Sequence, residues 1–260
     1  HKCNTLLEKI DGLEKLTKVK GSLTISCFDA LVEFPNLHSL TTLGALKVGV
    51  VDGLFTKDVI CDLSNVTFES FNGQQPAIRF FNDQEVISEG SGKTGDFFKE
   101  LRTKDDLSNV DIVTAISVTD EGLRPKLNVK KVKSLTSTVN LKSLSKDKSI
   151  PFTIEETIGN LQLVISGSNS GKIFNLSNLK SVNGYCFISF LTGQKLDLSN
   201  LEQTGGQLTI QCVGTKELVV SKLHSVCCAE SPSYKEENQG NLIRAFNVAT
   251  NISLDLPELE

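Results

Sequence analysis

The segment GSGKT at residues 90–94 contains the residue types of a phosphate-binding loop. Such a loop needs a glycine at position 87 when Gly92 and Lys93 form its Gly-Lys pair, because backbone N–H groups of the intervening loop cradle the phosphates. Position 87 is Ile87. These glycines therefore indicate an excursion of the chain, and we expect no nucleotide or other cofactor.

Acidic residues and nucleophiles show no arrangement that is typical of an enzyme. Glycoside hydrolysis needs two carboxylates placed across the scissile bond, and no Asp or Glu residues are spaced to stack on successive strands. Asp62 and Asp197 each precede an LSN segment, where a carboxylate has a capping role. The sequence contains no Ser-His-Asp arrangement and no GxSxG segment. It predicts a protein that is not an enzyme.

Seven cysteines are present, and their spacing does not suggest a metal site. There is no CxxC pair, and the three histidines have no HxxxH companion, whereas zinc sites draw on paired Cys or His. Some thiols can form disulfides near the two ends of the chain, and the alternative is that they are buried and free. The disulfide candidates are Cys3, Cys27, Cys212, Cys227 and Cys228. Cys186 takes a strand position held by Leu in its sister repeats, which favours a buried apolar side chain.

Basic residues cluster between positions 124 and 148, where eight Lys or Arg face a single Asp. A sulfated glycan or another anionic surface could use this cluster, with Lys130, Lys131 and Lys133 as contacts. A solvated face is the plainer interpretation. The whole chain has a net charge of −4, which argues against a nucleic-acid partner.

Residues 82–106 replace an expected repeat. We predict that they form an inserted loop with a short helix around Phe97, Phe98 and Leu101. Loops on a rigid scaffold are where recognition concentrates, so Phe97 and Phe98 are candidate partner contacts. An unconstrained insertion is the alternative.

Three glycosylation sequons begin at Asn65, Asn175 and Asn251. This is about the number that chance produces in a chain of this composition. Asn175 and Asn251 are the candidate acceptors on the surface. Asn65 is the weaker candidate, because we expect it to be buried in a repeated corner.

A repeat of 22 residues must position all of these side chains. The repeat is marked by LSNL or LSNV segments and related ones, whose last apolar residues are Val66, Val110, Val132, Ile154, Leu179, Leu201 and Leu223. The steps between them are 44, 22, 22, 25, 22 and 22 residues. LEKL at 13–16 and FPNL at 34–37 extend the series toward the N-terminus with looser spacing.

Each repeat continues from its apolar anchor through a polar step and a glycine into an alternating strand. The glycines are Gly21, Gly184 and Gly206, and a tight corner with positive φ favours this residue. One such unit cannot bury its apolar face alone, whereas stacked copies can. The sequence therefore predicts a mainly β chain, a parallel β-helix or leucine-rich-type solenoid of about ten rungs with capped ends.

A recurring asparagine accompanies the repeat. In a solenoid, one repeated position stacks on itself, and its amides can bond the backbone of neighbouring corners, each bond contributing about 1 kcal/mol. We predict a structural ladder of this kind at Asn36, Asn65, Asn109, Asn178 and Asn200.

The repeat predicts one domain over residues 1–260. Residues 1–12, with Leu6, Leu7 and Ile10 at helical spacing, are expected to form a capping helix. Repeats fill 13–226, and 227–260 form a C-terminal cap, with a loop at 229–250 before a final rung at Leu254–Leu256. Two fused halves that meet near 120–150 are the alternative.

Three blocks carry a family likeness: LEKLTKVKGSLTI at 13–25, LSNLKSVNGYCFI at 176–188 and LSNLEQTGGQLTI at 198–210. They resemble the receptor L domains of the insulin and epidermal growth factor receptors. They are similar also to the repeats of fungal GPI-anchored cell-wall proteins of the sporulation-specific family. The resemblance is clear at 13–66 and 154–226 and weaker at 107–150. It implies a right-handed solenoid with leucine-rich-type rungs, an extracellular setting, and binding rather than catalysis.

Together these observations predict a secreted or cell-surface glycoprotein that serves as a non-catalytic binding or adhesion module for a protein or glycan partner. A structural cell-wall or surface-coat protein without a discrete ligand is the alternative. No run of roughly 18 apolar residues is present, so we expect no transmembrane segment. The chain begins at His1 and has no Met, so we expect a signal peptide and any lipid-anchor signal to lie outside it. The oligomeric state is left open.

Overall fold

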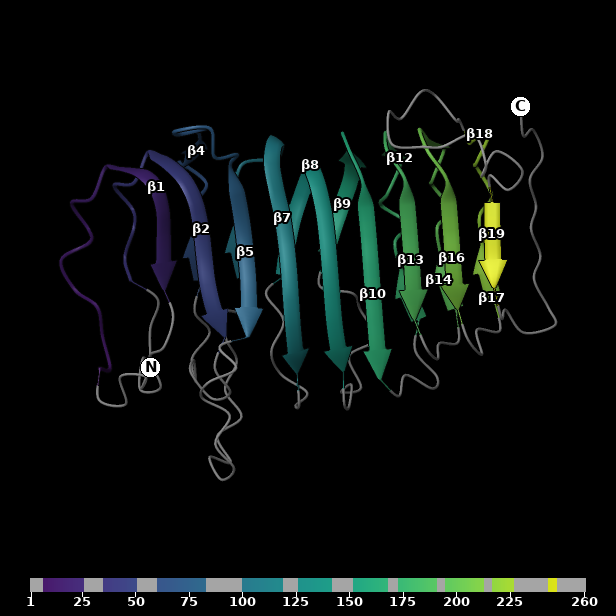
Figure 1. Cartoon of the computed structure of the whole chain (residues 1–260), viewed down its shortest axis with the longest axis horizontal. Coiled ribbons are helices and arrows are strands. Elements are labelled where there is room, and N and C mark those ends of the chain that lie inside the picture. The colour runs from purple at the N-terminus through teal and green to yellow at the C-terminus, as the bar shows by residue number, and fades with distance from the viewer. Residues whose placement is uncertain are drawn as a thin grey trace.

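The computed structural model is an elongated stack of β-strands (Figure 1). It describes residues 7–25, 35–50, 60–82, 100–118, 126–141, 152–167, 173–190, 195–212, 217–226 and 243–246. These ranges contain no helix. The chain is mainly β, and its parallel stacked strands form a β-solenoid, as the repeat predicts.

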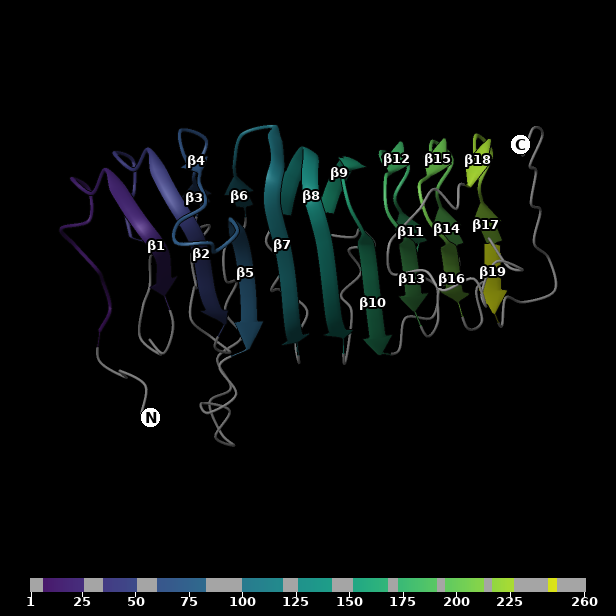
Figure 2. The same ribbon diagram turned by 45° about the horizontal axis from the view of Figure 1, so that its top comes forward.

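One long sheet runs along the molecule, with β1 at one end and β19 at the other (Figure 1). The strands on its main path follow one another in chain order, and all neighbours on this path are parallel. They are β1 (Lys18–Ile25), β2 (Thr42–Val50), β5 (Ala77–Asn82), β7 (Asp106–Val118), β8 (Lys126–Leu141), β10 (Leu161–Gly167), β13 (Cys186–Phe190), β16 (Leu208–Cys212) and β19 (Ile243–Phe246). Parallel neighbours need a crossover connection, and the remaining short strands lie on these crossovers (Figure 2).

The crossover strands form the other sides of the solenoid. Some are hydrogen-bonded into the long sheet: β3 (Ile60–Asp62), β4 (Thr67–Phe68), β6 (Glu100–Arg102), β9 (Phe152–Thr157), β12 (Ser181–Val182), β15 (Gln203–Thr204) and β18 (Ser225–Val226). Three others form a separate parallel sheet: β11 (Ile173–Asn175), β14 (Lys195–Asp197) and β17 (Glu217–Val219). Each turn of the chain thus surrounds a common interior.

The interior contains a column of apolar side chains that passes from strand to strand of the long sheet. Its members are register partners: Leu23, Leu46, Ile78, Ile112, Leu135, Leu161, Cys186 and Leu208. All of them except the terminal Leu23 are buried. Since each side chain is covered by those of the rungs before and after it, the stack rather than the single rung provides the hydrophobic core.

A side chain–backbone hydrogen bond shapes the corners of the rungs. In five places within the described ranges an Asp or Asn Oδ1 accepts the N–H of the residue two positions on, which is an Asx turn. The acceptors are Asn36, Asp62, Asp106, Asn175 and Asp197, at distances of 2.9–3.1 Å. The capping role expected for Asp62 and Asp197 is therefore confirmed.

The corner glycines are needed for two different reasons. Gly21 has φ of +112°, so the prediction of positive φ is confirmed there. Gly184 and Gly206 do not have positive φ. A Cβ at Gly184 would instead lie 2.8 Å from the backbone carbon of Gly159 on the preceding rung, so close packing between rungs requires this glycine.

The number and length of the rungs differ from the prediction. The main path of the long sheet has nine strands in the described ranges, whereas about ten rungs are predicted. Val132 pairs with Thr157, and Thr157 with Val182, so two successive rungs are each 25 residues long, where the predicted steps are 22 and 25. The predicted spacing is correct from Val182 through Thr204 to Val226.

The two DLSNV segments, 62–66 and 106–110, do not occupy the same place in a rung. Asp62 pairs with Arg102, which precedes Asp106 in the chain. Asp106 pairs with Lys131 instead, and a register shift follows between Leu107 and Asp111. The step between these two segments is therefore not two regular rungs.

The two predicted helices are wrong in the described part of the chain. Residues 7–12 contain no helix, and Ile10 packs half-buried against the core. Leu101 lies in β6, buried and paired with both Cys61 and Leu127, so part of the expected insertion is a rung. The last described strand, 243–246, falls inside the expected loop at 229–250. The predicted final rung at 254–256 lies outside the described residues.

Candidate binding surfaces

The outward side of the long sheet carries a row of register partners that we call the outer row. It consists of Thr24, Lys47, Arg79, Val113, Thr136, Gln162, Phe187 and Thr209. These residues alternate along the strands with the buried apolar column, so their side chains stand on the opposite side of the sheet. The outer row mixes cationic, apolar, aromatic and hydroxyl or amide groups on a regular backbone.

Tyr185 is the most exposed large apolar side chain among the described residues, at 40%. It precedes Cys186 and lies on the same side as Phe187. Its hydroxyl donates to Gln162 Oε1 at 3.2 Å, and its backbone N–H donates to Asn160 Oδ1 at 3.0 Å. An aromatic ring fixed beside amide groups can contact an apolar surface and orient a polar one at the same time.

A second surface carries charges that alternate from rung to rung, which we call the charge ladder. Its members are Asp105, Lys130, Glu155, Lys180 and Glu202. Lys130 lies 2.7 Å from Asp105, and Lys180 lies 2.6 Å from Glu155. The alternation places an opposite charge beside each member, and Asp105 raises the pKa of Lys130 by hydrogen bonding.

The predicted cationic contacts have carboxylate partners within the chain. Lys130 belongs to the charge ladder, Lys131 pairs with Glu156 at 3.2 Å, and Lys133 pairs with Asp111 at 3.1 Å. These carboxylates come from neighbouring rungs and therefore do not fall inside the basic stretch of sequence. The three lysines provide no uncompensated positive patch for an anionic ligand. Arg124, Lys142, Lys146 and Lys148 lie outside the described residues, as do Phe97 and Phe98.

Substitution Lys180→Glu is expected to destabilise the fold by roughly 1 kcal/mol, the scale of one exposed ion pair lost and like charges opposed. It would set three carboxylates in succession, at 155, 180 and 202. The loss should shrink at high salt, because screening weakens the repulsion. Urea unfolding at low and high salt measures this effect. Lys222→Glu is the control, since Lys222 is exposed and has no ion pair in the described part of the chain. Equal losses at both salt concentrations would contradict the ladder.

The predicted asparagine ladder is not a single column. Asn109 Nδ2 donates to Phe68 O and Asn200 Nδ2 donates to Ser177 O, both at 2.7 Å. Asn36 lies at the Asx position of its corner and aligns with Asp62 rather than with Asn65. Asn65 is exposed, so the expectation that it is buried was wrong. Asn178 is also exposed, and its side chain has no hydrogen-bond partner among the described residues.

Two of the three sequon asparagines lie in the described ranges, and both are exposed corner residues. Asn175 uses its Oδ1 to accept the N–H of Ser177 at 2.9 Å, which leaves Nδ2, the atom that a glycan is attached to, outside this bond. Burial does not distinguish Asn65 from Asn175. Asn251 lies outside the described residues.

Comparison with protein-family models, with curated proteins and with solved structures finds no match to this chain. The described ranges contain no helix that is long and apolar enough to span a membrane. They also contain no group of three His, Cys, Asp or Glu side chains arranged as metal ligands.

Two cysteines, Cys61 and Cys186, are free thiols buried in the core. Cys186 pairs with Leu161 and Leu208 on the two adjacent strands, which confirms that it replaces an apolar residue of the repeat. Of the disulfide candidates, Cys212 ends β16. Cys3, Cys27, Cys227 and Cys228 lie outside the described residues.

Burial raises the pKa of Cys186 from its ordinary 9.0 to about 12. In the folded chain this thiol keeps its proton up to high pH, whereas in the unfolded chain it loses the proton above pH 9. Its contribution to stability is therefore complete below pH 9 and declines above it, by about 1 kcal/mol at pH 10. The free energy of unfolding at pH 7 and pH 10 should show this decline, and Cys186→Val should reduce it. A decline of the same size in Cys186→Val would assign it to other groups.

Proposed function

We propose that the chain is a non-catalytic binding or adhesion module, secreted or held at a cell surface, with a protein or glycan partner. The observation that supports this proposal is the outer row with Tyr185 beside it. Neighbouring members of the row stand about 4.8 Å apart on hydrogen-bonded strands. A partner therefore meets groups that are already fixed, and little side-chain or backbone freedom is lost on binding.

The composition of this face favours a binder over a structural coat protein. A coat without a discrete ligand needs only small polar residues on each face. The outer row instead carries an aromatic ring at Phe187 and cations at Lys47 and Arg79, and the more exposed Tyr185 stands next to it. Aromatic and Arg side chains are the residues that most often carry binding energy.

We further propose that the solenoid is a right-handed, leucine-rich-type coil and that the protein is extracellular. Its signal peptide or lipid-anchor signal would lie outside this sequence. The support for these features is the resemblance of the repeat blocks to receptor L domains and to fungal cell-wall proteins. The exposed sequon at Asn175 is compatible with that setting.

Binding of the labelled protein to intact cells and to an array of immobilised glycans tests the proposal. The double substitution Tyr185→Ala with Phe187→Thr removes both rings from the face. Thr is suited to the second site because Thr209 occupies the same row on the next strand. We expect saturable binding that weakens about tenfold in this variant.

Ile158→Thr is the matched control, because Ile158 is also an exposed apolar residue at a rung corner, with 37% of its surface exposed. It should bind within about twofold of the original chain. Binding that the double substitution leaves unchanged would remove the outer row as the site. The absence of any saturable binding would favour the structural coat instead.

A further inference from the structure

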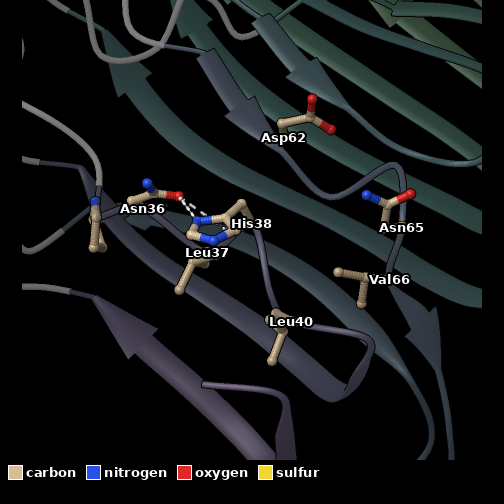
Figure 3. Close-up of a pocket in the computed structure, with 8 residues that line it drawn as sticks. Asn36, Leu37, His38, Leu40, Asp62, Asn65 and Val66 are labelled. Atoms are coloured by element: carbon tan, nitrogen blue, oxygen red, sulfur yellow. Dashed lines mark hydrogen bonds between the residues drawn. The ribbon is translucent and has the colours of Figure 1, made fainter. Parts of the chain in front are cut away.

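A cavity of about 300 Å³ opens between two consecutive corners near the N-terminal end of the solenoid. One corner is formed by residues 35–40 and the other by residues 62–66. Figure 3 shows Asn36 and His38 on one side of the opening and Asp62 and Asn65 on the other. Leu37, Leu40 and Val66, all buried, provide the apolar part of its wall.

This cavity exists where the regular bonding between corners is interrupted. In the C-terminal rungs, Asn200 Nδ2 donates to Ser177 O, and Ser221 Oγ donates to Ser199 O at 3.1 Å. Those bonds join each of these corners to the neighbouring one. At the N-terminal pair, the position of Ser64 in one corner is occupied by His38 in the other. The Asn65 side chain makes no hydrogen bond within the described part of the chain.

The polar groups around the cavity are both donors and acceptors. His38 Nδ1 lies 2.9 Å from Asn36 Oδ1, which leaves the second ring nitrogen for another partner. Asp62 Oδ1 accepts bonds from the backbone N–H and the hydroxyl of Ser64. These bonds hold the pKa of Asp62 below its usual range, so the side chain is a carboxylate at neutral pH. Asn65 offers an amide with two donors and an acceptor.

This combination matches a neutral hydroxylated ring better than it matches an ion. A sugar hydroxyl donates to a carboxylate and accepts from an amide at the same time, while the C–H groups of the ring pack against apolar side chains. Asp62 would repel an anion, and a cation would have only this one carboxylate to compensate its charge. The volume is at the small end of ligand sites, so it suits a single ring.

We propose that the cavity between the 35–40 and 62–66 corners is a binding site for one neutral saccharide unit. Asp62, Asn65 and His38 hydrogen-bond the hydroxyl groups, and Leu37, Leu40 and Val66 contact the ring. The site is separate from the outer row and does not depend on it. It fits either a free sugar or the terminal residue of a glycan.

Ligand-observed NMR on the full chain, with the methyl glycosides of glucose, mannose, galactose and N-acetylglucosamine as separate probes, tests this site. We expect saturation transfer from at least one of them, and dissociation constants about tenfold or more higher in Asp62→Asn and in His38→Ser. The residue that each substitution introduces already occurs at the equivalent position of another corner in this chain. Asn175 forms the same Asx turn as Asp62, and Ser occupies the position of His38 at Ser64, Ser177 and Ser199.

Asp197→Asn is the matched control. Asp197 forms the same Asx turn in a corner that is hydrogen-bonded to the preceding one through Asn200, so this substitution should leave binding unchanged. Tyr185→Ala should also leave it unchanged, so failure of the outer row and failure of this site are distinguishable. A glycan oligomer that binds better than its methyl glycoside through the same residues would identify a terminal residue as the ligand. The proposal is overturned if no probe binds, or if affinity is the same in Asp62→Asn and His38→Ser as in the original chain. It is overturned equally if methylammonium, added as a competitor, binds in place of the sugar.

Discussion

Gly205→Ala is expected to destabilise the solenoid by about 3 kcal/mol, at the upper end of the cost of overpacking. A Cβ on Gly205 would overlap the backbone oxygen and carbon of Asn183 on the preceding rung. Backbone atoms cannot turn aside as a flexible side chain does. The rungs would have to separate, and the 2.7 Å bond from Gly205 N–H to Val182 O would lengthen. Urea unfolding followed by circular dichroism measures the loss.

Asn183→Ala is the control for this substitution. Asn183 occupies the equivalent corner position one rung earlier, and its side chain is exposed. Its replacement should change stability by no more than about 0.5 kcal/mol. An unfolding midpoint of Gly205→Ala equal to that of the original chain would show that the rungs accommodate the extra carbon.

Leu135→Ala is expected to cost about 2–5 kcal/mol, because it leaves a cavity in the middle of the apolar column. Leu135 is completely buried and lies between Ile112 and Leu161. The column cannot collapse around the gap, since the sheet hydrogen bonds fix the distance between strands. Thermal and chemical unfolding should both report the loss.

Leu23→Ala provides the comparison at the end of the same column. Leu23 is half-buried and has one described strand neighbour in the sheet, β2. Its truncation should cost less than half as much as that of Leu135. Equal costs at the two positions would mean that stability does not depend on neighbours on both sides, contrary to the behaviour of a stacked repeat.

The solenoid itself was predictable because its signal is repeated many times. Period-2 alternation in segments such as Leu208–Ile210 and the recurrence of apolar anchors both require parallel stacking. Where the step is constant, from Val182 through Thr204 to Val226, sequence spacing and register agree. The rung that leads to Ile154 is longer than this step, and there the predicted anchors do not match: Ile154 pairs with Val129, not with Val132. The next predicted step, from Ile154 to Leu179, agrees with the register.

The corners were harder to predict, because identical letters can lie at different places in a rung. The two DLSNV segments differ in position, since hydrogen-bond register rather than sequence identity aligns them. The predicted ladder aligns Asn36 with Asn65, although Asn36 forms the same turn as Asp62. Aligning the sequences as NLHSL and DLSNV would have revealed the replacement of Ser by His38.

The candidate surfaces depend on residues from different rungs, and only the register brings them together. The basic stretch suggested an anionic ligand at Lys130, Lys131 and Lys133. Their carboxylate partners include Glu156 and Asp111, each of which lies about one rung away in sequence. Counting charges along the sequence finds the lysines of the basic stretch but not these partners. In the solenoid, each of the three lysines lies beside a carboxylate from a neighbouring rung.

The charge ladder also restricts how the chain can grow or shrink over evolution. The signs at Asp105, Lys130, Glu155, Lys180 and Glu202 alternate. Deleting the one rung that contains Lys180 would bring Glu155 against Glu202, and duplicating it would set two lysines side by side. Removing or adding two rungs preserves the alternation. Length variants of this chain should therefore differ by even numbers of rungs in this region, a parity rule imposed by electrostatics.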